Sequence, residues 1–482
     1  MNVQSRAARI SRSSLPLPLS ERNWNPLVLA AVCTSTGVAT WSFVIGGSAA
    51  LYVGAVAGMI AMTAGALLGQ LLVNLATVPA ATKHGIETTT STKPQLGSRG
   101  SVIGLGLLLF TSIGWNTVLM IFFGRAAASA MIVLGIAGEG SRDLVATLFS
   151  AGGLLVLAFL VTRGTRSLSR TGPTIAVCIV ILTGWLLYLL LDRFGWSAID
   201  SAEPLDPADS FAVNYTSAFE LLVAGTFGWW GYMGGMVRMV SKAGKTILPT
   251  MIGLGLAWAV VASVSLFGAL MTGEPDPTIW APMIAGDFTA IIVLIFIALA
   301  NLGSTLVGIF VSTLAIKQTR GFGRKVSWNT IVVCVATPML LCIVVIPHLI
   351  FDNVPVFMAY LGMVLGPMIG IQIADWYVLG RRKTLSVAAL YQPGRESAYW
   401  YVGGFNPAGI LGLILGTVTY AAILDPNTYV PNAAFFQYTT AAVPSVIVGG
   451  LVYVICTMIM RRFLPAPPTR QGAAEPTAEG AD

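Results

Sequence analysis

Charged side chains are scarce in this chain. Only 10% of its 482 residues are Asp, Glu, Lys or Arg, whereas a soluble domain has about 25%. Hydrophobic residues make up 55%, so polar side chains are too few to cover a surface that faces water. This composition excludes a soluble globular protein and makes a lipid bilayer the surrounding medium.

Histidine and cysteine are also rare, and neither occurs in a pattern that binds a metal or performs catalysis. The two histidines, His84 and His348, lie in or near predicted loops without partners. The five cysteines fall inside apolar segments with no metal or disulfide spacing, which is typical of packing residues. A phosphate-binding loop and a row of like charges are absent as well. These absences disfavour a membrane-embedded enzyme, an ATP-driven pump and a channel, and no cofactor is expected.

Long apolar runs dominate what remains. Windows of roughly 20 apolar residues predict an all-α polytopic membrane protein with about twelve transmembrane helices. These spans are expected near residues 26–50, 51–80, 101–136, 143–162, 172–192, 213–238, 247–272, 287–315, 328–349, 354–379, 405–424 and 436–460.

The net charge of +7 is distributed unevenly between the predicted loops. If the N-terminus is cytoplasmic, the inside loops hold all of the 27 basic residues except Arg125, Arg142 and Arg193. The opposite loops are acidic, as at Asp206 and Glu274. This asymmetry follows the positive-inside rule, so the basic residues indicate topology and not a nucleic-acid partner. We expect an integral protein of the plasma membrane with both termini cytoplasmic.

Two predicted spans are interrupted by glycine and hydroxyl residues, at 33–47 and at 224–235. Unwound backbone at membrane depth survives only where protein or a watery cavity satisfies its polar groups. Interrupted segments at corresponding places in the two halves of a membrane protein point to a transporter's binding site. The two breaks therefore predict a secondary transporter with a site near the middle of the membrane.

Several stretches carry a resemblance to a known family. They are the lead into the first span (21–32), the loop 85–101 with its Gly-Ser-Arg-Gly-Ser ending, and the run 365–383 with its Gly-Pro start and Arg-Arg-Lys end. Trp115 also follows Ser101 at a matching spacing. Together they resemble the nucleobase–cation symporter family, which includes purine–cytosine and hydantoin permeases.

The resemblance implies a LeuT-like fold of two inverted five-helix repeats with discontinuous helices 1 and 6, plus two C-terminal helices. Spans 3, 4, 8 and 9 would rock against spans 1, 2, 6 and 7 to give alternating access. The chain is expected to divide into a cytoplasmic N-terminal segment, a first repeat, a second repeat, two extra helices and a tail predicted by its composition to be disordered. These parts cover residues 1–25, 26–192, 213–379, 405–460 and 465–482.

A planar heterocycle can stack on an indole face, and the resemblance assigns this role to Trp115. The alternative is an ordinary packed aromatic. Leu119 stands where the family often has a glutamine that reads the edge of the ring. In span 6, one alignment selects Trp229 and places Gly235 at a family aspartate, whereas a second selects Gly225–Phe227. The expected substrate residues are Ala39, Trp115, Leu119, Gly225, Phe227, Trp229 and Asn301.

A sodium ion needs hard oxygen ligands, which broken helices supply as free carbonyl groups. The resemblance carries these ligands to the Ser35 and Val38 carbonyls of span 1. In span 8 it carries them to the Asn301 carbonyl and to the hydroxyls of Ser304 and Thr305. The alternative is that these hydroxyls bond to their own or a neighbouring helix, and a proton stays open as the coupling ion.

Two charged residues, Arg125 and Glu220, are predicted to lie within spans. Ionisable groups at membrane depth are functional candidates by default. Both are expected in the outer half of the membrane. One interpretation is that they pair in an outer gate, and another is that Glu220 carries a coupling proton. A structural ion pair, or a Glu220 side chain that reaches the interface, are the alternatives.

Together these features favour a cation symporter of a nucleobase or related heterocycle, such as cytosine, a purine, allantoin or hydantoin. The absent glutamine and aspartate leave a second possibility open, namely another small solute such as an amino acid or a vitamin precursor. The sequence does not predict an oligomeric state.

Overall fold

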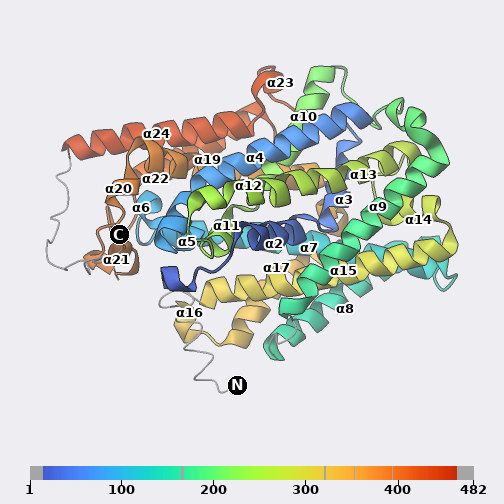
Figure 1. The fold of residues 1–482 in the computed structure, drawn as a ribbon, viewed down its shortest axis with the longest axis horizontal. Coiled ribbons are helices and arrows are strands. Elements are labelled where there is room, and N and C mark those ends of the chain that lie inside the picture. Colours follow the sequence, from blue (N-terminus) through green and yellow to red (C-terminus); the bar gives the residue numbers. More distant parts are fainter. Residues whose placement is uncertain are drawn as a thin grey trace.

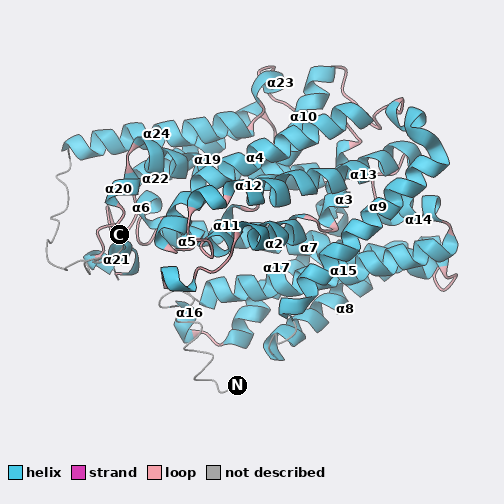
Figure 2. Ribbon diagram, viewed as in Figure 1, coloured by secondary structure: helices cyan, strands magenta, loops and turns pink. Residues whose placement is uncertain are grey.

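The computed structural model describes residues 15–163, 168–317, 319, 322–351, 353–392 and 394–463. Within these ranges the chain is helical apart from loops and two isolated β-bridges (Figure 2). Nine of the described helical segments are long and apolar enough to cross a membrane. Each overlaps all or most of one long helix: α4 (Ala55–His84), α7 (Ser101–Val133), α8 (Arg142–Arg163), α9 (Leu168–Asp200), α13 (Ala257–Thr272), α15 (Asp287–Lys317), α17 (Trp328–Val345), α19 (Val354–Ile373) and α24 (Ala442–Phe463).

The first predicted span is broken as expected. It consists of α2 (Pro26–Gly37) and α3 (Trp41–Ala49), which are bent by 63° relative to each other. The sixth is interrupted more gently, between α10 (Phe211–Phe227) and α11 (Trp230–Val237). There the N–H groups of Gly228 and Trp229 bond the carbonyls three residues earlier, which tightens the helix into a 3₁₀ turn.

One further apolar helix, α22 (Pro407–Ile423), lies at the predicted eleventh span and has only 17 residues. The observed elements therefore fall at the twelve expected places, and the count of twelve spans stays a prediction. The tail 465–482 and residues 1–14 of the predicted N-terminal segment lie outside the described residues.

Small residues allow the broken first span to lie directly on the seventh. A Cβ atom at Gly37 would come within 2.2 Å of the Gly253 carbonyl oxygen, and one at Gly46 within 1.9 Å of the Ala262 carbonyl oxygen. Gly253 belongs to the π-helical turn η4 (Met251–Leu256), which follows α12 (Ile247–Thr250) and precedes α13. Backbone therefore packs on backbone, which only glycine permits at these points.

The helices form the two groups that the family resemblance implies. Helices α7, α8, α15 and α17 pack on one another, whereas α4 packs on α10 and α11, and α3 packs on α13. A third group of α19, α22 and α24 lies along one side of the molecule, opposite α8, α15 and α17 (Figure 1). The broken segments therefore lie between helices that could move relative to each other.

Candidate functional site

A cavity of about 480 Å³ lies beside the two interrupted segments. Its lining comes from both segments and from α7 and α15, which face each other across it. From Trp115 the cavity continues past Tyr232 to Glu87, in the loop after α4, and to Ala315, near the end of α15. It therefore runs from the breaks toward the end of the molecule where α7 begins and α15 ends.

Indole rings cluster at the inner end of this cavity. The ring of Trp41, the first residue of α3, has its centroid 5.1 Å from that of Trp115 and 5.5 Å from that of Trp229. Trp258 packs edge-on against Trp41 at 4.6 Å, and Phe357 packs against Trp115 at 5.3 Å. Offset and edge-to-face rings at such distances offer flat faces to a planar ligand.

Trp41 was not among the predicted site residues. The sequence did contain a signal for it, because Trp41 is the first residue after the break at Gly37–Thr40. A large aromatic side chain that follows unwound backbone at membrane depth has to face whatever the break surrounds.

Polar groups in the lining are few. Asn116 donates a hydrogen bond from Nδ2 to the Ser112 carbonyl at 2.5 Å. Its side chain packs against Gly308 of α15, where a Cβ atom would come within 2.1 Å of Asn116 Oδ1. Trp229 Nε1 is a buried donor without a partner among the described residues. The cavity thus combines aromatic faces with isolated polar groups, the pattern of a small-molecule site.

The carbonyl groups of Ser35 and Val38 are released from the usual helical bonding. In a continuous helix the N–H groups of Ala39 and Ser42 would donate to them. Instead, Ala39 donates to the Gly37 carbonyl and Ser42 to the Ala39 carbonyl, each at 3.1 Å. Both carbonyl oxygens therefore remain available to another ligand.

Span 8 brings oxygen atoms to the same place. The Thr40 hydroxyl, in the break of span 1, donates a hydrogen bond to Oδ1 of the fully buried Asn301. Thr305 is also fully buried, and its Oγ1 has no hydrogen-bond partner in the part of the chain that the structure describes. Two turns later, by contrast, Thr313 Oγ1 donates to the Ile309 carbonyl at 2.7 Å. A buried hydroxyl without a described partner, on a helix that Asn301 joins to the break in span 1, fits a site for a hard cation.

The structure brings most of the predicted residues together. Ser35, Val38, Ala39, Trp115, Leu119, Gly225, Trp229 and Ser304 line the cavity. Asn301 and Thr305 are fully buried and are not part of the lining. Phe227 is not part of the lining, because its ring is fully buried near Gly366 of α19. Residues two apart on a helix point about 200° away from each other, so Gly225 and Phe227 cannot both face the cavity.

The predicted pairing of Arg125 with Glu220 is wrong. Arg125 Nη1 lies 2.7 Å from Asp276 Oδ2, in the loop before α14 (Pro277–Ala285), and its guanidinium covers the ring of Phe351. Glu220 faces α24 instead, where its Oε2 accepts a hydrogen bond from the Ala442 N–H at 3.3 Å. Its side chain is fully buried, so it does not reach the membrane interface either. The two residues therefore have different partners, Asp276 before α14 and Ala442 at the start of α24.

An ion pair that sequence reasoning missed borders the far end of the cavity. Glu87, just before α5 (Thr88–Ser91), lies 2.8 Å from Arg238 at the end of α11. Burial raises the pKa of the Glu87 carboxyl group, and the neighbouring Arg238 opposes that shift. The pair joins the loop after span 2 to the end of span 6.

A family model described as "Permease for cytosine/purines, uracil, thiamine, allantoin" matches residues 16–456. The chain belongs to this permease family. An allantoin permease of Bacillus subtilis (strain 168) is 24% identical over 96% of this chain and 96% of the relative. A hydantoin permease of Microbacterium maritypicum is 22% identical over 91% of this chain and 88% of the relative.

Solved structures of Mhp1, a nucleobase-cation-symport-1 family transporter, have the same fold. The closed conformation with bromovinylhydantoin bound is 19% identical, with a TM-score of 0.74 over 95% of this chain and 97% of that one. The inward-facing conformation is 18% identical, with a TM-score of 0.77 over 95% of each chain. The predicted family and the LeuT-like fold class are confirmed. The permease is an integral membrane transporter and not an enzyme.

Proposed function

We propose that this permease is a cation symporter that takes up a planar heterocycle of the nucleobase, allantoin or hydantoin class by alternating access. The observation that carries this proposal is the cavity in which three indoles adjoin a helix break with released carbonyl groups. The names of the allantoin and hydantoin permeases point to the same class of substrate.

The substrate ring is proposed to stack between Trp115 and Trp229, with Trp41 behind it. Ring geometry adds about 0.5–1.5 kcal/mol to the burial of apolar area in such contacts. Asn116 is then placed to read a polar edge of the ring, because Leu119 offers no hydrogen bond. Ala39 and Gly225 complete the wall with small residues that leave room for the ligand.

The coupling cation is proposed to bind next to the ring, between spans 1 and 8. Its ligands would be the carbonyls of Ser35, Val38 and Asn301 and the hydroxyls of Ser304 and Thr305. These five oxygens carry no formal charge, which suits a monovalent ion such as Na⁺ better than a divalent ion that calls for carboxylates.

A proton is the second candidate for the coupling ion, and Glu220 is the residue that favours it. Glu220 is fully buried and has no ion pair among the described residues, and such a carboxylate is costly to keep charged. Arg125 and Asp276 would instead act as a structural or gating pair at the opposite end from Glu87. We also place both termini on the cytoplasmic side of the plasma membrane, on the charge distribution of the loops. The two repeats are proposed at 26–192 and 213–379, on the resemblance to the family.

Uptake into proteoliposomes tests the proposal. Purified protein would be offered labelled allantoin, hydantoins, cytosine, uracil, adenine and thiamine precursors under an inward Na⁺ gradient, a pH gradient, or neither. At least one heterocycle should accumulate, and faster with one of the two gradients. If no heterocycle accumulates or raises the melting temperature, the proposed substrate class is wrong.

A further inference from the structure

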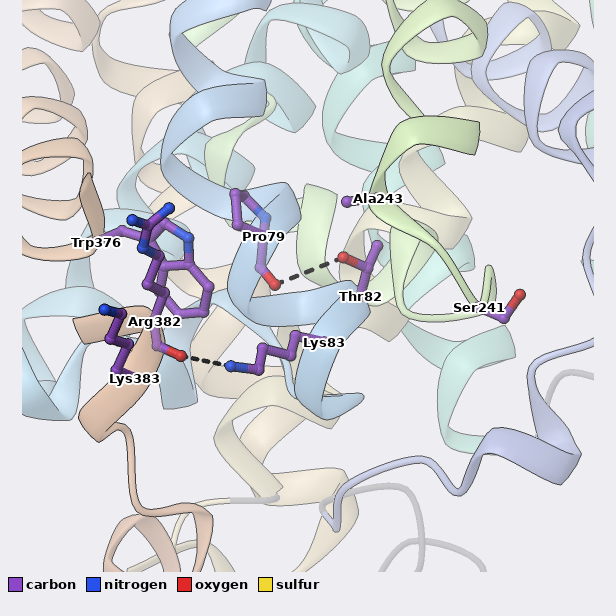
Figure 3. A pocket seen from close by; sticks show the side chains of 8 residues that line it. All are labelled: Pro79, Thr82, Lys83, Ser241, Ala243, Trp376, Arg382 and Lys383. Carbon is purple, nitrogen blue, oxygen red and sulfur yellow. Dashed lines mark hydrogen bonds between the residues drawn. The ribbon is translucent and has the colours of Figure 1, made fainter. Parts of the chain in front are cut away.

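A second cavity, of about 430 Å³, lies at the end of the molecule that the loop charges predict to be cytoplasmic (Figure 3). The last turn of α4, the loop between α11 and α12, and the segment that runs from α19 into α20 (Arg381–Thr384) form its walls. It shares no lining residue with the substrate cavity. The two cavities are therefore separate candidate sites.

The charged side chains that line this second cavity are all basic: Lys83, Arg382 and Lys383. The Lys83 ammonium group donates to the main-chain carbonyl of Arg382 (Figure 3), which ties α4 to α20 and leaves the two α20 side chains uninvolved. Neither Arg382 nor Lys383 lies within ion-pair distance of a carboxylate in the described ranges. Three clustered cations without an anion favour an anionic ligand.

The neighbouring Arg381 shows what a structural arginine looks like in this segment. Its Nε lies 3.0 Å from Oδ2 of the fully buried Asp375, which also accepts hydrogen bonds from Gln95 and Tyr453. Arg381 therefore links span 10 to the loop after span 2 and to span 12. Arg382 and Lys383 form no such ion pair with a described carboxylate, and both are exposed.

The depth of the cavity indicates the source of the anion. Trp376 and Pro79 form an apolar wall, and tryptophan is enriched at the level of lipid headgroups. In the adjoining segments of the chain, Val378 is 63% exposed and Leu248 of α12 is 67% exposed. In a membrane protein such apolar surface faces acyl chains, so the basic cavity opens where the apolar belt ends.

We propose that this cavity binds the phosphate of an anionic phospholipid headgroup from the cytoplasmic leaflet. Lys83, Arg382 and Lys383 would hold the phosphate, and an acyl chain would run along the apolar surface near Leu248 and Val378. Each basic residue near an anionic leaflet contributes roughly a fivefold gain in affinity. The bound lipid would connect the end of span 2 and the loop after span 6 to the end of span 10.

Lipid titration of the purified protein tests this proposal, with native mass spectrometry as the readout. Phosphatidylglycerol should bind in preference to phosphatidylcholine. The variant Arg382→Gln/Lys383→Gln should bind phosphatidylglycerol about 30-fold more weakly. The matched control is Arg461→Gln/Arg462→Gln, another adjacent basic pair at the same end of the protein, and it should bind like the wild type. If both double variants bind phosphatidylglycerol equally weakly, or if neither binds it more weakly than the wild type, the proposal that this cavity binds the lipid is wrong.

A second pair of variants covers the case in which the double variant does not fold. Ser241 is an exposed residue of the lining, so Ser241→Glu should exclude the lipid by repulsion, whereas Ser241→Ala should not. Glycerol 3-phosphate separates the two sources of phosphate. If it occupies the cavity as well as phosphatidylglycerol does at the same concentration, the ligand is a soluble anion and the lipid assignment is wrong.

Discussion

Trp115 has two neighbours that make its replacement informative. Trp41 and Phe357 pack against it, so the ring is held in place without a ligand. Trp115→Phe keeps an aromatic face. Trp115→Ala removes both the buried apolar area and the additional stabilisation that comes from the stacking of two rings. We expect Trp115→Ala to weaken substrate binding about 10- to 100-fold and Trp115→Phe to weaken it far less. Isothermal titration with the substrate measures both, and equal losses in the two variants would argue against stacking.

Thr305 and Thr313 offer a matched comparison on one helix. The Thr305 hydroxyl has no partner among the described residues, whereas that of Thr313 bonds its own helix. If Thr305 is a cation ligand, Thr305→Ala should raise the Na⁺ concentration needed for half-maximal uptake by about tenfold or more, because bonds to charged groups contribute roughly 1.5–3 kcal/mol. Thr313→Ala should leave that concentration unchanged. The same shift in both variants would indicate a general packing defect.

Glu220 tests the choice of coupling ion. Its burial, with no ion pair in the described part of the chain, favours the neutral form, and Glu220→Gln mimics that form. If Glu220 exchanges a proton during transport, the variant should lose pH-gradient-driven uptake while it still binds substrate. If instead uptake and its pH dependence match the wild type, Glu220 has only a packing role and proton coupling through it is excluded.

The broken first span could be predicted from sequence, because glycine and hydroxyl residues at membrane depth have one physical explanation. The partners of individual side chains could not. Position along a predicted span gives an expected depth for Arg125 and Glu220, and that depth stays a prediction. The side of the helix that each occupies depends on helix rotation and packing, and there Asp276 and Ala442 are the partners.

The same limit applies to the lining of the cavity. Two sequence alignments select different residues of span 6, one Trp229 and the other Gly225–Phe227. In the structure Gly225 and Trp229 both line the cavity and Phe227 does not, in agreement with helical periodicity. The contribution of Trp41 depends on the 63° bend between α2 and α3. A sequence reveals that a break exists but not its angle.

The contact between α3 and α13 depends on one glycine. A Cβ atom at Gly46 would lie 1.9 Å from the Ala262 carbonyl oxygen, which belongs to rigid helical backbone. Gly46→Ala should therefore destabilise the protein by about 1–3 kcal/mol, as overpacking does. Gly106→Ala is the control, because nothing lies within 4 Å of the added atom. Thermal unfolding in detergent measures both, and an unchanged melting temperature for Gly46→Ala would contradict the close packing.

Within the described residues, the lining of the substrate cavity extends from the helix breaks toward one end of the protein. On α7 its lining extends from Leu119 back to Leu108, and on α15 it extends forward to Ala315. Toward the other end, the rings of Trp41, Trp115 and Phe357 pack on one another. With the orientation that the loop charges predict, this arrangement is an inward-facing state of an alternating-access cycle.

Accessibility of introduced cysteines tests both the orientation and the state. Ala315→Cys places a thiol at the far end of the cavity, and Gly140→Cys places one on an exposed 3₁₀ turn at the opposite end of the protein. A membrane-impermeant maleimide should label Ala315→Cys in inside-out vesicles but not in intact cells, and Gly140→Cys in intact cells but not in inside-out vesicles. Substrate should slow the labelling of Ala315→Cys alone, because only that thiol lies in the binding cavity. The reverse pattern of labelling would place the termini outside, and labelling of Ala315→Cys from both sides would mean that the cavity alternates rapidly between the two faces.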